Sequence, residues 1–145
     1  MYTIGRVAEM FAIPISTLRY YDKEGLFPYM ERENGIRRFG ETEIEELRII
    51  EYLKTSGLEI KEIKRFMQWV TEGPATYAQR KELFERRREA VLADIARLQK
   101  TLAMLEFKCW YYDTAIADGN EDRIAAMLPD KLPPDVQALY DTVHC

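Results

Sequence analysis

A stretch without helix-breaking residues lies between Pro74 and Gly119, since no glycine or proline interrupts it. Within it, apolar side chains recur at alternating steps of four and three residues, the spacing of a heptad repeat. The positions are Phe84, Arg88, Val91, Ile95, Leu98, Leu102, Leu105, Cys109, Tyr112 and Ile116, with a polar break at Arg88. This pattern predicts one long helix over residues 74–118 with a continuous apolar stripe.

The length of this helix limits how its stripe can be buried. At 1.5 Å per residue the helix would be on the order of 60 Å long, too long for the preceding segment to cover. A second chain must therefore cover it. The predicted dimerisation seam is Val91, Ile95, Leu98, Leu102, Leu105, Cys109 and Tyr112. The sequence thus predicts a homodimer, while the heptad period leaves parallel and antiparallel pairing open.

Two short helices joined by a tight turn are predicted near the start of the chain. Thr3 is placed to cap a first helix whose apolar face runs from Ile4 to Phe11. Pro14 suits the first turn of a second helix, because backbone N–H groups have no partner there. That helix is expected to stop at Gly25.

The second helix is predicted to present a polar, aromatic and basic outer face. We expect Ile15 and Leu18 to point inward. The outer face is expected to carry Ser16, Thr17, Arg19 and Tyr20, with Tyr21 at the boundary between the two faces.

A β-hairpin is predicted next. Asn34-Gly35 between extended stretches is the strongest short-range hairpin signal and favours a type I′ turn. Arg37 and Arg38 follow directly in the second strand. The sequence therefore predicts a small basic wing.

Two further helices and a tail complete the chain. One helix is expected from about Thr42 to Gly57, and the next from Ile60 to a stop at Gly73-Pro74. The proline-containing tail is expected to form one or two helical turns docked on the dimer. The prediction is a mainly α fold: a winged helix-turn-helix head (1–73), a long dimerisation helix (74–118) and a short helical tail (119–145).

Composition and motif content exclude several classes of function. A net charge of −4 argues against coating nucleic acid with the whole surface, but permits a local basic face. No segment approaches the roughly 20 apolar residues of a membrane span, and no signal peptide opens the chain, so we expect a cytoplasmic protein. Without a phosphate loop, a nucleophile elbow or clustered histidines, we predict no enzyme activity, no catalytic residues and no cofactor.

The head admits two functional interpretations. A polar helix beside a basic hairpin suits a protein that enters a major groove and contacts the flanking phosphates. Winged helical modules also bind proteins, so a coiled-coil adaptor without DNA activity is the alternative.

Three segments resemble one known family: YTIGRVAEMFAIPISTLRYYDKEGLF, then ENGIRRF, then LKTSGLEIKEIKRF. They are similar, over roughly residues 2–70, to the N-terminal half of MerR transcription regulators. The resemblance implies an antiparallel coiled-coil dimer whose recognition helices enter successive major grooves of a pseudo-palindromic operator in double-stranded promoter DNA. In the family, distortion of that DNA realigns promoter elements for RNA polymerase, an indirect partner.

The resemblance assigns DNA contacts residue by residue. The second helix would contribute Ser16, Thr17, Arg19, Tyr20 and Tyr21, with Arg19 and Tyr20 the strongest candidates. Arg37, beside Arg38, would act in the wing, and Lys54 would face a phosphate. Two positions depart from the family: Pro14 replaces a serine N-cap, and Ile36 replaces the tyrosine of the wing.

For an effector the sequence offers only candidates. Trp69, Trp110, Tyr111 and Tyr140 could line a pocket for an apolar or cationic small molecule, or could simply pack the core. Cys109 is expected to be a small buried hydrophobe on the seam. Cys109 and Cys145 make no short-spaced ligand pair, so we predict no metal site.

Overall fold

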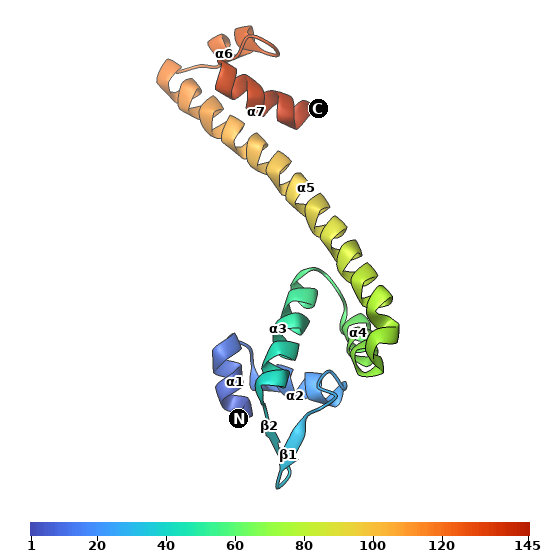
Figure 1. Ribbon diagram of the computed structural model, residues 1–145. Coiled ribbons are helices and arrows are strands. Elements are labelled where there is room, and N and C mark those ends of the chain that lie inside the picture. The colour runs from blue at the N-terminus through green and yellow to red at the C-terminus, as the bar shows by residue number, and fades with distance from the viewer. The chain divides into compact units, whose positions relative to one another are not determined.

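Figure 1 shows the computed structural model, which describes residues 1–145. The chain divides into two compact units, Met1–Ala90 and Val91–Cys145. Each unit is described by itself below. The first contains the predicted head together with the beginning of the long helix.

The first unit opens with the expected helix pair, α1 (Ile4–Phe11) and α2 (Ile15–Lys23). The Thr3 hydroxyl accepts a hydrogen bond from the Arg6 backbone N–H at 3.2 Å, which confirms Thr3 as the N-cap. The tight turn between the helices places Ala12 in the left-handed region at φ 54°. Pro14 is the N-cap residue of α2, immediately before the helix.

The predicted wing is confirmed. Strands β1 (Glu31–Glu33) and β2 (Ile36–Arg38) pair antiparallel, with Glu33 opposite Ile36 on either side of the two-residue turn. Asn34 and Gly35 have φ values of 52° and 79°, as a type I′ turn requires. Tyr2 pairs with Phe39 just beyond β2, so the N-terminus joins the base of the wing.

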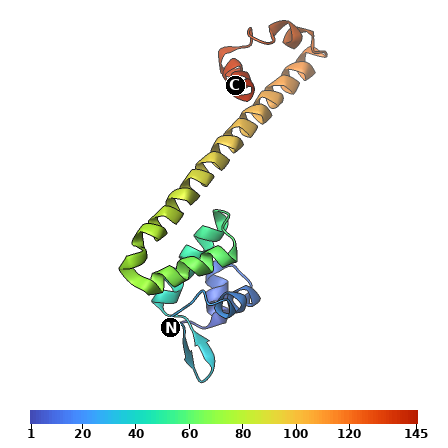
Figure 2. The same ribbon diagram turned by 90° about the vertical axis from the view of Figure 1, so that its right-hand side faces the viewer.

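Helices α3 (Glu41–Thr55) and α4 (Ile60–Glu72) follow, as their apolar periodicity predicts. A 3₁₀ turn, η1 (Gly73–Thr76), then leads into α5 (Tyr77–Asp118). The buried Thr76 hydroxyl donates to the Trp69 carbonyl, and the Arg80 guanidinium donates to Thr76 and to the Gly73 carbonyl. Figure 2 shows the sharp change of direction that these bonds hold between α4 and α5.

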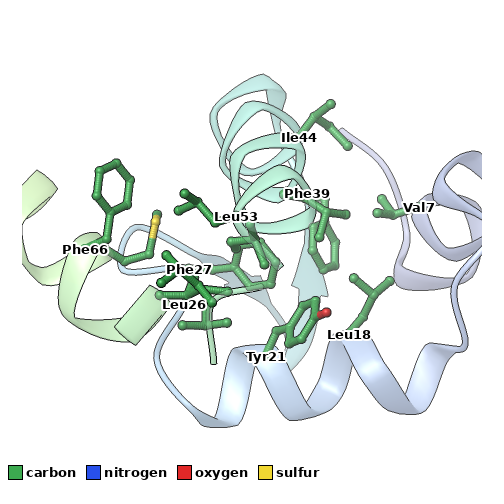
Figure 3. Packing of buried hydrophobic residues seen from close by; sticks show 14 of the residues in the cluster. Val7, Leu18, Tyr21, Leu26, Phe27, Phe39, Ile44, Leu53 and Phe66 are labelled. Carbon is green, nitrogen blue, oxygen red and sulfur yellow. The ribbon is translucent and has the colours of Figure 1, made fainter. Parts of the chain in front are cut away.

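The core of the first unit gathers apolar side chains from α1 to α4 (Figure 3). Leu18 and Tyr21 of α2 point into it, and the rings of Phe27 and Phe39 meet edge to face at 5.4 Å. Each fully buried side chain of this size contributes roughly 1.5–3 kcal/mol through its removal from water.

The inward face of α2 differs from the prediction, because Ile15 is 37% exposed. Helical residues six apart lie about 120° apart around the axis, so Ile15 and Tyr21 cannot both face one narrow core. Tyr21 takes the inward position.

The second unit contains the rest of α5, followed by α6 (Asp122–Met127) and α7 (Pro134–His144). Its core is formed by Phe107 of α5 with Leu132 and Val136. Figure 1 shows α7 running back alongside the end of α5. The tail thus contains two helices, of 6 and 11 residues, where one or two helical turns were predicted, and it packs on α5 of its own chain.

Candidate nucleic-acid interface

The outer face of α2 carries most of the predicted DNA-contacting side chains. Ser16, Arg19 and Tyr20 are exposed, and Thr17 is half-buried. Leu18 and Tyr21 are buried and fix the rotation of the helix, so Arg19 and Tyr20 are directed away from the core. This arrangement provides hydroxyl, aromatic and guanidinium groups on a single rigid element.

Tyr21 corrects the sequence analysis, which placed it among the DNA contacts. Its side chain is only 1% exposed and therefore offers DNA almost no surface. Its hydroxyl donates to Glu51 Oε1 at 3.0 Å and accepts from Lys54 Nζ at 3.0 Å. Tyr21 is thus a positioning residue between α2 and the C-terminal end of α3.

The electrostatics of this cluster keep Lys54 charged. Burial raises the pKa of the Tyr21 phenol, although the hydrogen bond from Lys54 acts in the opposite direction. The hydrogen bond to Tyr21 raises the pKa of Lys54. Lys54 is an exposed side chain, so its ammonium group is held at the surface in the charged form that a phosphate would attract.

Asp22 is a residue that the sequence analysis missed. Its carboxylate, only 6% exposed, accepts from Arg32 at 2.6 Å and from Arg37 at 2.5 Å. Asp22 lies in the last turn of α2, whereas the two arginines lie opposite each other on β1 and β2. A single acid thus fixes both wing strands to α2. The sequence signal was an acid close to a basic hairpin, which periodicity alone does not detect.

The wing arginines differ in their surroundings. The Nε of Arg37 donates to Asp22, and the Arg37 side chain is 28% exposed, so part of the guanidinium still faces solvent. Arg38 lies 3.2 Å from the exposed carboxylate of Glu33 on the facing strand. Part of the positive charge of the wing is therefore balanced within the chain, whereas no carboxylate lies within salt-bridge distance of Arg19.

Comparison with known proteins identifies this arrangement. Residues 2–69 match the family described as MerR HTH family regulatory protein, and residues 44–106 match the family described as MerR, DNA binding. An uncharacterized HTH-type transcriptional regulator of Haemophilus influenzae is 40% identical over 120 residues, spanning 82% of this chain and 89% of that protein. The chain belongs to the MerR family. It is a DNA-binding transcription regulator, as the resemblance implied.

Solved structures of MerR proteins have a similar fold. The crystal structure of HiNmlR, a MerR family regulator lacking the sensor domain and bound to promoter DNA, matches with a TM-score of 0.74 at 38% identity. The match covers 84% of this chain and 98% of that one. A MerR family transcriptional regulator from Bacillus thuringiensis matches with a TM-score of 0.68 at 41% identity, covering 74% of this chain and 96% of that one.

The predicted dimerisation seam of this MerR chain forms an exposed apolar stripe. Leu98 and Leu102 are 56% and 54% exposed, and Val91, Ile95, Leu105 and Tyr112 are also exposed. Cys109 is exposed in the single chain as well. The prediction that Cys109 is buried therefore depends on a second chain and stays a prediction.

The aromatic residues proposed as an effector pocket do not form one cluster in either unit. Trp69 packs against the core of the first unit. Trp110, Tyr111 and Tyr140 instead surround Phe107 in the second unit, with ring centroids 5.5–6.1 Å from it. Helical spacing did not reveal that α7 packs on Phe107. A pocket that combines all four residues stays a prediction. In the second unit the rings serve as core.

No group of three or more His, Cys, Asp and Glu side chains gathers to hold a metal ion. His144 Nδ1 lies 2.8 Å from the Tyr140 carbonyl one turn earlier.

None of the helices combines the length and apolar character needed to cross a membrane.

Proposed function

We propose that this MerR protein binds a pseudo-palindromic promoter operator as a homodimer, with α2 of each chain in a major groove and the wings on flanking phosphates. The observation that carries the proposal is the outer face of α2, fixed to the wing through Asp22. Base contacts are assigned to Ser16, Thr17, Arg19 and Tyr20. Phosphate contacts are assigned to Arg37, Arg38 and Lys54.

The homodimer is supported by the apolar stripe along α5. Contiguous apolar surface of this kind is rare on soluble monomers and marks an interface. A helix of 42 residues spans about 63 Å at 1.5 Å per residue, enough to hold two heads apart by successive major grooves. The pairing we propose is antiparallel, as in the family.

The regulatory step we propose is distortion of the bound operator. Bending or untwisting a promoter changes the alignment of the elements that RNA polymerase reads, at a cost of several kcal/mol that protein contacts must offset. Polymerase would then be affected through the shared promoter. A small-molecule effector would act by changing how well the two heads fit the distorted DNA.

Charge reversal at Arg19 tests the DNA interface. Duplexes are selected from a random pool with the wild-type protein, labelled, and titrated with the Arg19→Glu and Lys131→Glu variants. Lys131 is an exposed lysine of the second unit and serves as the control. We expect Arg19→Glu to weaken binding by ~100-fold or more while the sedimentation mass stays that of the wild type. Wild-type DNA affinity in Arg19→Glu would overturn the assignment of α2.

Removal of Arg37 tests the role of the wing. A phosphate contact carries no sequence information, so Arg37→Gln should weaken binding to all duplexes similarly. The slope of the logarithm of affinity against the logarithm of salt concentration should flatten by about one. A loss confined to one base pair of the operator would contradict the phosphate contact.

A further inference from the structure

A groove in the first unit lies between α4 and the first turns of α5, and none of the residues assigned to DNA lines it. Its volume is about 370 Å³, within the roughly 300–1,000 Å³ typical of small-molecule sites. The lining residues are Leu58, Glu62, Arg65, Trp69, Gln79, Glu82, Leu83, Arg86 and Arg87. The groove thus combines apolar walls with several charged groups.

The apolar part of the lining is suited to a flat hydrocarbon body. Leu58 is 7% exposed, and both Leu83 and Trp69 pack against the core while bordering the groove. The Arg65 guanidinium lies 5.4 Å from the centre of the Trp69 ring. Arginine and aromatic faces both stack on planar groups, so these side chains favour a planar ligand over a branched one.

The charged part of the lining favours an anion. Glu82 is already paired with Arg86 at 2.5 Å, and Glu62 accepts from the Glu59 backbone N–H at 3.4 Å at the start of α4. No carboxylate lies within salt-bridge distance of Arg65 or Arg87. Two guanidinium groups of the lining therefore lack a carboxylate, and a ligand could supply one, in bidentate geometry at Arg65.

Arg87 also connects the groove to the turn between α3 and α4. Its guanidinium donates to the carbonyl and, at 3.3 Å, to the hydroxyl of Ser56, which ends α3. Gly57 follows with a φ of 103°, a conformation that favours glycine, and a Cβ added there would lie 2.9 Å from Arg87 Nη2 and displace the end of this side chain. Ser56 is two residues from Lys54, which is bonded to Tyr21 of the recognition helix. An anion that attracts Arg87 would therefore act on the end of the helix that holds Lys54.

We propose that this groove binds a small organic anion with a planar apolar body, of the aromatic carboxylate class, and that Arg87 couples its occupancy to DNA binding. Binding in the groove is independent of the proposed function. The coupling to DNA affinity rests on the proposed function. A peptide segment of a protein partner would need a longer depression than this compact groove provides.

The binding half is tested on the intact wild-type protein by NMR of the tryptophan indole N–H groups, with benzoate and phenylacetate as probes. The chain has two tryptophans, so Trp110 in the second unit is an internal reference for Trp69. Benzamide and phenylacetamide are neutral controls of the same shape. We expect saturable shifts of the Trp69 signal with the carboxylates and none with the amides.

Two variants sharpen this test. Arg65→Gln should raise the Kd of the carboxylates ~10-fold, whereas Lys61→Gln, which removes a charge that is 82% exposed on the same helix outside the lining, should not change it. The binding site is overturned if neither carboxylate produces a saturable shift, if the amides shift Trp69 equally, or if Trp110 shifts in parallel.

The coupling half is tested by titrating selected duplex DNA with and without saturating benzoate at constant ionic strength. We expect benzoate to change DNA affinity at least ~3-fold in the wild type and to leave it unchanged in Arg87→Met. Benzoate binding without a change in DNA affinity would overturn the coupling alone. Benzoate binding by a protein that selects no DNA would instead overturn the proposed function and leave the groove assignment standing.

Discussion

At the scale of single residues, Asp22 shows how one side chain organises a surface it does not itself form. Two arginines on neighbouring strands repel each other unless a negative charge lies between them. The buried carboxylate of Asp22 supplies that charge and holds both guanidinium groups in place through ion pairs. The wing therefore depends on α2 for its position as well as on its own hairpin.

Replacing Asp22 should loosen the wing without unfolding the head. We expect Asp22→Asn to lower the free energy of unfolding by about 1.5–3 kcal/mol, the range for hydrogen bonds to charged groups, and to weaken DNA binding. Glu33→Gln removes the exposed partner of Arg38 and should cost at most about 1 kcal/mol. Urea denaturation and DNA titration measure both effects, and equal losses in the two variants would contradict the role of Asp22.

Glu46 is a second informative residue because it is a nearly buried acid. Burial, with a smaller contribution from the charge of Glu43, raises its pKa from 4.5 to about 7. Its Oε2 atom has no hydrogen-bond partner, which agrees with a carboxyl group that is poorly compensated when ionised.

This raised pKa predicts a pH dependence of stability. Between about pH 4.5 and 7 the folded chain retains a proton on Glu46 that the unfolded chain releases. The free energy of unfolding should therefore fall as pH rises through this window and level off above it. Glu46→Gln should remove that fall and exceed the wild type at about pH 8, whereas the exposed Glu45→Gln should keep it. Parallel pH profiles for wild type and Glu46→Gln would refute the assignment.

At the scale of elements, the sequence predicted most accurately where one local rule decides the conformation. The Thr3 cap and the Asn34-Gly35 turn depend on the chemistry of neighbouring residues and were both correct. The ends of the helices followed from glycine positions, whereas α5 begins at Tyr77, after η1, and not at the predicted Pro74. These features could be predicted because no distant part of the chain is needed to form them.

The errors arose where distant residues compete for the same space. Ile15 and Tyr21 could not both face the core, and the choice between them depends on how α3 packs on α2. Asp22 and the Phe107 cluster depend on contacts across the fold that spacing along the chain does not encode. Helix α2 was therefore correctly located, while the residues that hold it in position were not.

The wing turn gives a test at this scale. Gly35 has a φ of 79°, which a residue with a Cβ adopts only under strain, so Gly35→Ala should destabilise the fold by about 1 kcal/mol or more. Gly5 lies in α1 with nothing within 4 Å of an added Cβ, so Gly5→Ala should be neutral or stabilise by up to about 1 kcal/mol. Thermal unfolding of both variants measures the contrast, and destabilisation of the same size in both would contradict it.

At the scale of the whole molecule, α5 contributes to two different structures. Phe84 packs edge to face on Phe66 at 5.4 Å within the head, while Leu98 and Leu102 belong to the exposed stripe of the second unit. One continuous helix therefore carries both head packing and the proposed dimer contact.

A charge on the stripe should separate the proposed dimer. Leu98→Asp would bury an unpaired carboxylate between two chains, so we expect the mass of a monomer in sedimentation equilibrium at about micromolar concentration. Gln99→Asp introduces the same charge one position along, off the heptad seam, and should remain dimeric. An unchanged mass for Leu98→Asp would contradict the seam.

The turn at the tip of the wing also limits the chemical stability of the protein, because its sequence favours deamidation of Asn34. Asn34 precedes a glycine whose backbone nitrogen is unhindered by a side chain, and both residues are exposed. Attack of that nitrogen on the side-chain amide carbon of Asn34 forms a cyclic imide and releases ammonia, and water then hydrolyses the imide to aspartate or isoaspartate. Each product adds a negative charge to a basic wing, and isoaspartate lengthens the backbone within the turn. Stored protein will therefore differ in charge from fresh protein at the tip of the wing.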